Sequence, residues 1–184
     1  MRLLQPGVVA NAAAIILVAV VVISAVSDVW KGKIYNVVTY PAIVIGLGLQ
    51  LAQHGFAGLM SSLEGLAICV LPTLPLLLLG GLGGGDVKLL AVVGIVAGWP
   101  AAAEALLLTF VFAGLVALGE LAWHGRLYAT LWRALRVAVG LVVRKWRPPA
   151  PTTPPLPVRF AVAVCLGVLA TLWDLQSGVF SRLF

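Results

Sequence analysis

The sequence predicts an all-α, polytopic membrane protein with about six transmembrane helices and a cytoplasmic amphipathic helix. Hydrophobic residues make up 62% of the 184-residue chain and charged residues only 10%, and the mean hydropathy is +1.12. A soluble domain of this size could not bury so much apolar surface. Cys69 and Cys165 lie in apolar runs and form no Cys-x-x-Cys pair, which argues against a zinc site and a disulfide framework.

Apolar stretches of membrane-spanning length define the predicted helices. The candidate spans are residues 8–27, 38–53, 60–80, 87–99, 101–122 and 158–178. The first is long for a signal-peptide core and lacks a convincing Ala-x-Ala cleavage site, so we expect it to be retained. Trp99-Pro100 ends the fourth in a turn or a kink, because proline disfavours helical geometry in the residue before it.

The basic residues favour a turn at Trp99-Pro100. With a turn, almost all lysines and arginines fall on one side of the membrane, and only Arg2 and Arg182 fall on the other. A kink would place the later basic stretch opposite Lys31 and Lys33. The positive-inside rule therefore predicts that both termini lie outside the cytoplasm. Topology and attraction to anionic lipid account for the net charge of +6 without a nucleic-acid partner.

Residues 123–157 are expected to form a cytoplasmic loop within a single membrane-embedded domain, residues 1–184. Residues 130–147 have the pattern of a basic amphipathic helix that lies on the membrane surface. The proline-rich residues 148–157 predict a stiff, extended connector.

Asp86 is the most informative residue, because it follows Gly83, Gly84 and Gly85 between long apolar stretches. An ionisable group at membrane depth is costly and therefore indicates function. Glycines disfavour a regular helix and let another chain come close. If Trp99 marks the outer interface, Asp86 lies below the cytoplasmic surface in a water-accessible pocket. The structural alternative is an N-cap, since aspartate opens helices well.

Asp28 is a second carboxylate at the same face, after the first span and before Ile34-Tyr35-Asn36. An acid at the C-terminal end of a helix opposes the macrodipole, which makes Asp28 more informative than an arbitrary juxtamembrane acid. Lys88, two residues after Asp86, either contacts substrate or lowers a carboxyl pKa, or else it extends its ammonium to the cytoplasmic interface. Asn36 either orients the first acidic loop or ends a turn.

The remaining acids are expected to be interfacial or structural: Glu64, Glu104 and Asp174 toward the outer face, and Glu120, with Arg126 as a candidate partner, toward the inner face. No metal or cofactor site is predicted, because His54 and His124 fall near opposite faces.

The two acidic segments resemble those of the type IV prepilin peptidases, which belong to the GxGD class of aspartyl proteases. The matching residues are Asp28 with Ile34-Tyr35-Asn36, and Gly83-Gly84-Gly85-Asp86 with Val87-Lys88-Leu89-Leu90. The family pattern after the first aspartate reads Ile-Pro-Asn, so Tyr35 is a departure. Residues 156–161 resemble the proline-containing entry to the family's last helix, and the resemblance covers about residues 10–175.

This resemblance implies that Asp28 and Asp86 are catalytic and that the substrate is a prepilin or pseudopilin. Its basic leader would be cleaved at the cytoplasmic face, before its apolar helix, in association with pilus assembly machinery. The chain starts close to its first span without a cysteine-rich region, so it resembles the short, peptidase-only form of Flp-type pili. Two neighbouring carboxyls do not both ionise readily. One would activate water and the other would polarise the scissile carbonyl; the residues leave open which does which.

Two other functions are compatible with the residues. Glycine-broken helices with buried acids also occur in ion-coupled transporters, although only one such glycine cluster is present here. The other alternative is a catalytically inactive factor of pilus assembly.

Overall fold

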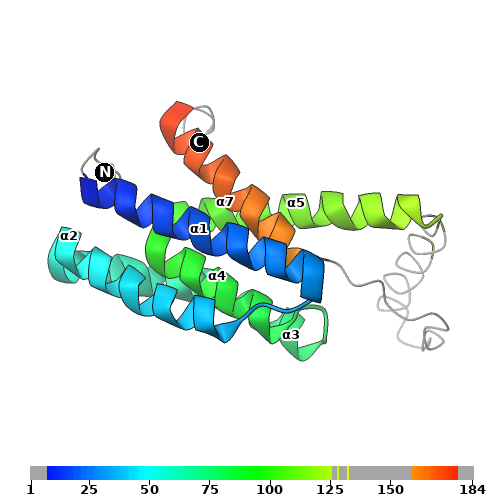
Figure 1. The fold of residues 1–184 in the computed structure, drawn as a ribbon, viewed down its shortest axis with the longest axis horizontal. Helices are drawn as coiled ribbons and strands as arrows, with labels where there is room; N and C mark the ends of the chain where they lie inside the picture. Colours follow the sequence, from blue (N-terminus) through cyan, green and yellow to red (C-terminus); the bar gives the residue numbers. More distant parts are fainter. Residues whose placement is uncertain (1–7, 126–127, 129–131, 133–158, 178–184) are drawn as a thin grey trace, which may run out of the picture. The chain divides into compact units, whose positions relative to one another are not determined.

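The computed structural model describes residues 8–125, 128, 132 and 159–177. The helices are α1 (Val8–Lys31), α2 (Asn36–Val70), α3 (Leu74–Leu78), α4 (Gly84–Ala97), α5 (Ala101–Trp123) and α7 (Phe160–Ser177) (Figure 1). These residues contain no strand, so the predicted all-α class is confirmed.

Three helical segments are long and apolar enough to cross a membrane: Ala13–Lys31, Asn36–Leu78 and Ala101–Trp123. The count of about six spans stays a prediction. The predicted amphipathic helix, residues 130–147, and the proline-rich connector, residues 148–157, lie outside the described residues apart from Trp132.

The chain divides into two compact units, one formed by Met1–Ala113 with Arg159–Phe184 and the other by Gly114–Val158. The described part of the second unit is mainly the C-terminal half of α5. The first unit contains both predicted catalytic acids. The expectation of a single domain stays a prediction.

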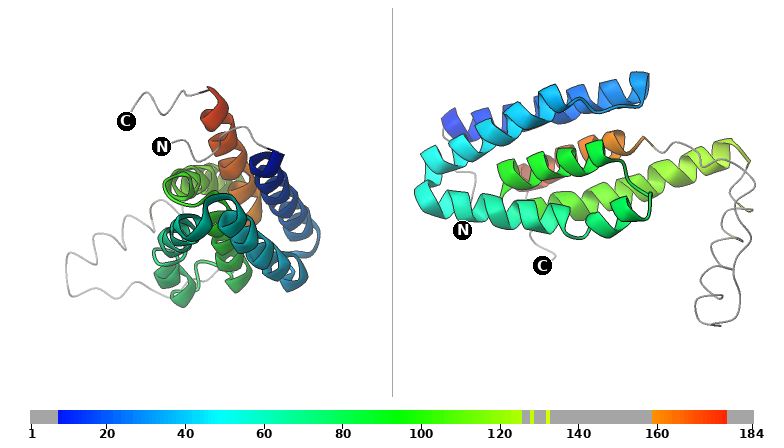
Figure 2. Two further views of the ribbon diagram at one scale, coloured as in Figure 1. Left: turned by 90° about the vertical axis from the view of Figure 1, so that its left-hand side faces the viewer. Right: turned by 90° about the horizontal axis from the view of Figure 1, so that it is seen from below.

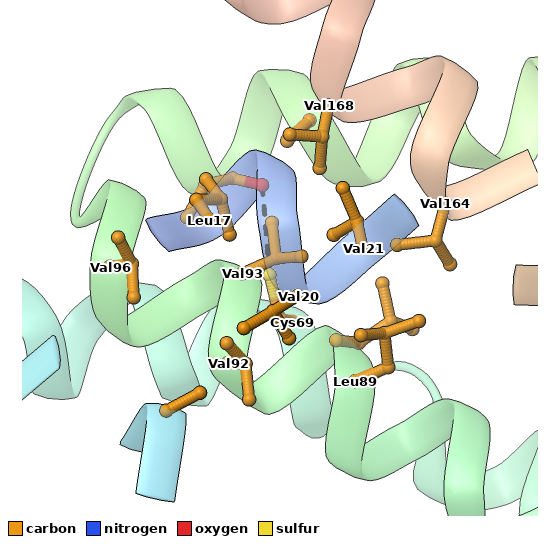
Figure 3. Packing of buried hydrophobic residues seen from close by; sticks show 14 of the residues in the cluster. Leu17, Val20, Val21, Cys69, Leu89, Val92, Val93, Val96, Val164 and Val168 are labelled. Carbon is orange, nitrogen blue, oxygen red and sulfur yellow. Dashed lines mark hydrogen bonds between the residues drawn. The ribbon is translucent and has the colours of Figure 1, made fainter. Parts of the chain in front are cut away.

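Helix α4 is central to the first unit, because its residues are buried on all sides. Four residues within one stretch of five have no exposed surface: Leu89, Leu90, Val92 and Val93. They pack in one cluster with Val21 of α1 and other small apolar side chains of α2 and α7 (Figure 3). A helix that is apolar all round is buried within its bundle. This packing fixes the position of the first turn of α4, where Asp86 lies.

Helix α2 is broken at Gly55, whose φ of 59° and ψ of −143° are not helical and favour glycine. On one side of the break, the Gln50 amide donates to the Val96 carbonyl at 2.8 Å. On the other side, the Ser62 hydroxyl donates to the Ile95 carbonyl at 2.9 Å. The two arms thus lie against the same helix, and they run in opposite directions along α4 (Figure 2).

Glycines allow the second arm of α2 to approach α4 backbone to backbone. A Cβ on Gly65 would meet the carbonyl of Gly94, and a Cβ on Gly94 would meet that of Gly65. Such small-residue contacts are typical of helix pairs in membranes. The predicted span 60–80 is interrupted, since α2 ends at Val70 and the short helix α3 begins at Leu74. Pro72 explains this difference, because proline supplies no backbone N–H and clashes with the preceding turn.

The predicted turn at Trp99-Pro100 is confirmed. Helix α4 ends at Ala97, Gly98 has a φ of 66°, and α5 begins at Ala101. Helix α5 then runs back along the first unit, because its Phe110 ring packs edge-on against Phe160 at 6.2 Å between centroids. Phe160 begins α7 at the end of the unit where the predicted acids lie.

Candidate active site

Asp28 lies in the last turn of α1 and is half-buried. Its Oδ2 accepts a hydrogen bond from the backbone N–H of Ala161, in the first turn of α7, at 3.3 Å. Arg159, directly before α7, is exposed and close enough for its positive charge to act on the Asp28 carboxyl. The unfavourable position of Asp28 in α1 is therefore offset by the N-terminus of a different helix.

Asp86 lies in the first turn of α4 and is also half-buried. Its Oδ2 accepts a hydrogen bond from the backbone N–H of Gly83 at 3.1 Å. The N-cap itself is Gly83, so the expectation that Asp86 would be the N-cap is wrong. Asp86 is the third helical residue and binds back to the cap, which is the carboxylate half of a capping box.

The glycine cluster is helical in part, which corrects the expectation that it would prevent a regular helix. Gly84 and Gly85 are the first two residues of α4. A Cβ on Gly85 would lie 3.0 Å from the Cβ of Ile34, whereas a Cβ on Gly84 would meet no atom within 4 Å. Gly85 therefore permits contact within the protein, and Gly84 leaves space beside Asp86.

The loop after α1 packs on the start of α4, so the two acidic segments are in contact with each other. Besides the contact of Ile34 with Gly85, the Lys88 ammonium donates to Asn36 Oδ1 at 2.9 Å. The same ammonium lies 5.1 Å from the centroid of the Tyr40 ring. Lys88 is thus directed toward α2, and its predicted roles stay predictions.

The carboxyls of Asp28 and Asp86 are close enough to interact, although they come from α1 and α4. Burial raises the pKa of Asp86 to about 6, the hydrogen bond from Gly83 opposes this rise, and the negative charge of Asp28 adds to it. Asp86 precedes the apolar run of α4 and lies outside the helices long enough to cross a membrane. A carboxyl with such a pKa can hold a proton near neutral pH.

Several further predictions concern the surroundings of the acids. A hollow of about 340 Å³ beside α1 is lined by Ser27, Lys31 and Tyr35 among apolar residues, but by neither aspartate. The predicted wet pocket around Asp86 therefore stays a prediction. The predicted pairing of Glu120 with Arg126 involves a residue outside the described ones.

Glu104 of α5 and Asp174 of α7, for which structural roles are predicted, lie close enough for their carboxyl groups to interact. Asp174 is only 2% exposed. Neither acid contributes to the interaction between Asp28 and Asp86.

Three contacts of the site could not be predicted from spacing alone: Ala161 with Asp28, Arg159 with Asp28, and Asn36 with Lys88. The first two join residues more than 130 positions apart in the sequence. The only sequence signal for them was the resemblance of residues 156–161 to the entry of a last helix.

The fold and site define a helical membrane protein with an interacting carboxyl pair at one end of its bundle. A model of the type IV leader peptidase family matches residues 15–118, which include Asp28, Asn36, Asp86 and Lys88. This match covers more than half of the chain, and the chain belongs to that family. Neither the curated proteins nor the solved structures include a match. Arg159 lies outside the matched residues.

Proposed function

We propose that the protein is a prepilin leader peptidase of the aspartyl type. It removes the basic leader of type IV prepilins or pseudopilins, Flp-type ones in particular, and does not methylate the new terminus. The observation that carries this proposal is the interaction between Asp28 and Asp86, two carboxyls from separate helices. Membership of the type IV leader peptidase family supports a peptidase with a prepilin-type substrate.

The proposed reaction is peptide hydrolysis by two carboxyls and one water, without a metal or cofactor. The ionised carboxyl takes a proton from the water as it attacks, and the protonated carboxyl polarises the scissile carbonyl. The raised pKa of Asp86 supports this division, because the pair then carries one proton over an accessible pH range.

The proposed topology has about six spans, with both termini outside the cytoplasm and the acids at the cytoplasmic face of a bacterial inner membrane. Two reversals of the chain support it, one at Gly55 and one at Trp99-Pro100. With these reversals, one crossing each comes from α1, both arms of α2, α4 from Val87 onward, α5 and α7. Residues 130–147 would lie on the cytoplasmic surface as an amphipathic helix.

Gly84 is proposed to leave room for the extended substrate backbone beside Asp86. The Gly84→Ala variant is expected to keep its thermal stability, since a Cβ there meets no protein atom within 4 Å. We expect kcat/KM for leader cleavage to fall by about 10–10²-fold, because a small displacement of a reacting group is costly.

Gly48→Ala is the matched control for this prediction, because it also adds a Cβ in a helix where no atom lies within 4 Å. It should retain wild-type kcat/KM. Equal activities of Gly84→Ala and the wild type would argue against substrate approach at Gly84. Gly85→Ala is a different test, since its Cβ would press on Ile34 and disturb the joined loops.

The experiment that tests the function is incubation of the purified protein, in lipid bilayers, with a synthetic peptide. The peptide carries a basic leader followed by an apolar helix, and mass spectrometry identifies its products. Cleavage at one bond before the apolar helix supports the proposal. An intact peptide after prolonged incubation with folded protein would contradict it. Aspartate-dependent ion flux would then indicate a transporter, and restored pilus assembly without cleavage would indicate an assembly factor.

A further inference from the structure

The two acids of the site differ in the cations that surround them. The Asp28 carboxyl receives the Ala161 N–H at the N-terminus of α7 and experiences the positive charge of Arg159. Burial is the larger effect at Asp28 and favours its neutral form, and the helix N-terminus and the nearby guanidinium both oppose burial by stabilising the ionised form. Because Arg159 directly precedes α7, both effects come from the same end of one helix.

Asp86 has a lysine two positions along its own helix, but that lysine is held elsewhere. The Lys88 ammonium donates to Asn36 Oδ1 at 2.9 Å and lies 5.1 Å from the Tyr40 ring centroid. The charge that acts on Asp86 is the negative charge of Asp28, which favours a neutral Asp86. Burial favours the neutral form too and outweighs the hydrogen bond from Gly83.

The remaining cations near the first acidic segment are Lys31 and Lys33 in the loop after α1. The Lys31 ammonium lies 5.5 Å from the centroid of the Tyr35 ring. Both side chains are exposed, and Arg159 is the cation whose charge acts on Asp28. The surroundings of the two acids therefore differ. The positive charge of Arg159 acts on Asp28, whereas the Lys88 ammonium is held by Asn36 and Tyr40 instead of Asp86.

We propose that Asp28 is the ionised acid that activates water, that Asp86 is the protonated acid, and that Arg159 is the positioning residue that fixes this assignment. The inference rests on the proposed peptidase function and deepens it. Asn36 has the complementary role of holding Lys88 away from Asp86, so that Asp86 keeps its proton.

The assignment gives a balanced reaction. Water adds to the scissile carbonyl carbon while Asp28 accepts a water proton and Asp86 gives its proton to the carbonyl oxygen, forming a gem-diol. Asp28 then gives its proton to the amide nitrogen, and Asp86 takes a proton from one hydroxyl as the C–N bond breaks. The products are a carboxyl terminus and an amine, and both acids return to their starting forms.

The activity test compares the pH profiles of kcat/KM for the wild type and Arg159→Gln. Loss of a single partly exposed charge should move the acidic limb, which reports ionisation of Asp28, upward by about half a pH unit. The alkaline limb should stay in place, and Arg159→Lys should restore the wild-type profile. Lys33→Gln removes one positive charge from the exposed loop and is the matched control, with no expected shift of either limb.

A merely structural role for Arg159 would lower the rate without moving one limb. That result, or a shift confined to the alkaline limb, would overturn the assignment. Asn36→Ala supplies a second variant, since a released Lys88 should move the alkaline limb downward.

Infrared spectra test the assignment without cleavage. At a pH of about 5, below the pKa of about 6 of Asp86, the wild type should show the C=O band of a protonated carboxyl of this pair. Asp86→Asn should remove this band, while Asp28→Asn should retain it. The reverse pattern would overturn the assignment even in a protein that cleaves normally. Failure of the wild type to cleave any leader peptide would instead contradict the proposed function.

Discussion

Replacement of Asp86 by asparagine is expected to lower kcat for leader cleavage by about 10²–10⁴-fold, the usual contribution of a positioned acid or base. The amide keeps an oxygen that can accept the Gly83 N–H, so the first turn of α4 should remain folded. It cannot exchange a proton as the carboxyl does. Steady-state kinetics on a leader peptide, with circular dichroism to check the fold, would measure this effect.

Asp28→Asn should cause a loss of similar size, because the two carboxyls act as a unit. The double variant should then be about as inactive as either single variant, since effects within one catalytic unit are not additive. Glu64→Gln is a suitable control, because it makes the same chemical change at an exposed acid of α2. Activity within tenfold of the wild type in either aspartate variant would contradict the two-acid mechanism.

The second large effect is a fall in kcat/KM at alkaline pH. Because Asp86 is the carboxyl with a pKa of about 6, kcat/KM should fall tenfold for each pH unit above that value. On the acidic side, protonation of Asp28 removes the base, so the profile should be bell-shaped. Its two apparent pKa values belong to the coupled pair. Bound substrate excludes water, so the alkaline limb of kcat should lie at higher pH than that of kcat/KM.

The same raised pKa makes the stability of the folded protein depend on pH. Asp86 binds its proton more tightly when folded, so the folded state is most favoured below the ordinary carboxyl pKa. This contribution is lost as the pH rises through about 6. Thermal unfolding at several pH values should show the decrease, and Asp86→Asn should weaken it. A kcat/KM that stays constant from below pH 6 to well above it would contradict a protonated Asp86.

The helices and their limits were largely predictable from local residues. The apolar stretches gave the all-α class, and Trp99-Pro100 was correctly identified as a turn from the distribution of charge. The break within the predicted span 60–80 was not predicted, because the apolar run continues past Pro72 although α2 ends at Val70 and a separate helix, α3, follows. The capping role of Asp86 was also misplaced, since a glycine can serve as N-cap when a later carboxylate binds back to it.

The amino-acid sequence by itself determined that the protein is helical and apolar. Its two acidic segments also indicated the leader peptidases and identified Asp28 and Asp86 as the candidate acids. Only the tertiary structure decided how the acids differ. Their carboxyl groups have the same chemistry, and their protonation depends on burial and on charges that come from other helices. Arg159 comes to Asp28 with the start of α7, and Lys88 turns to Asn36 on α2, because packing brings together segments that spacing does not connect.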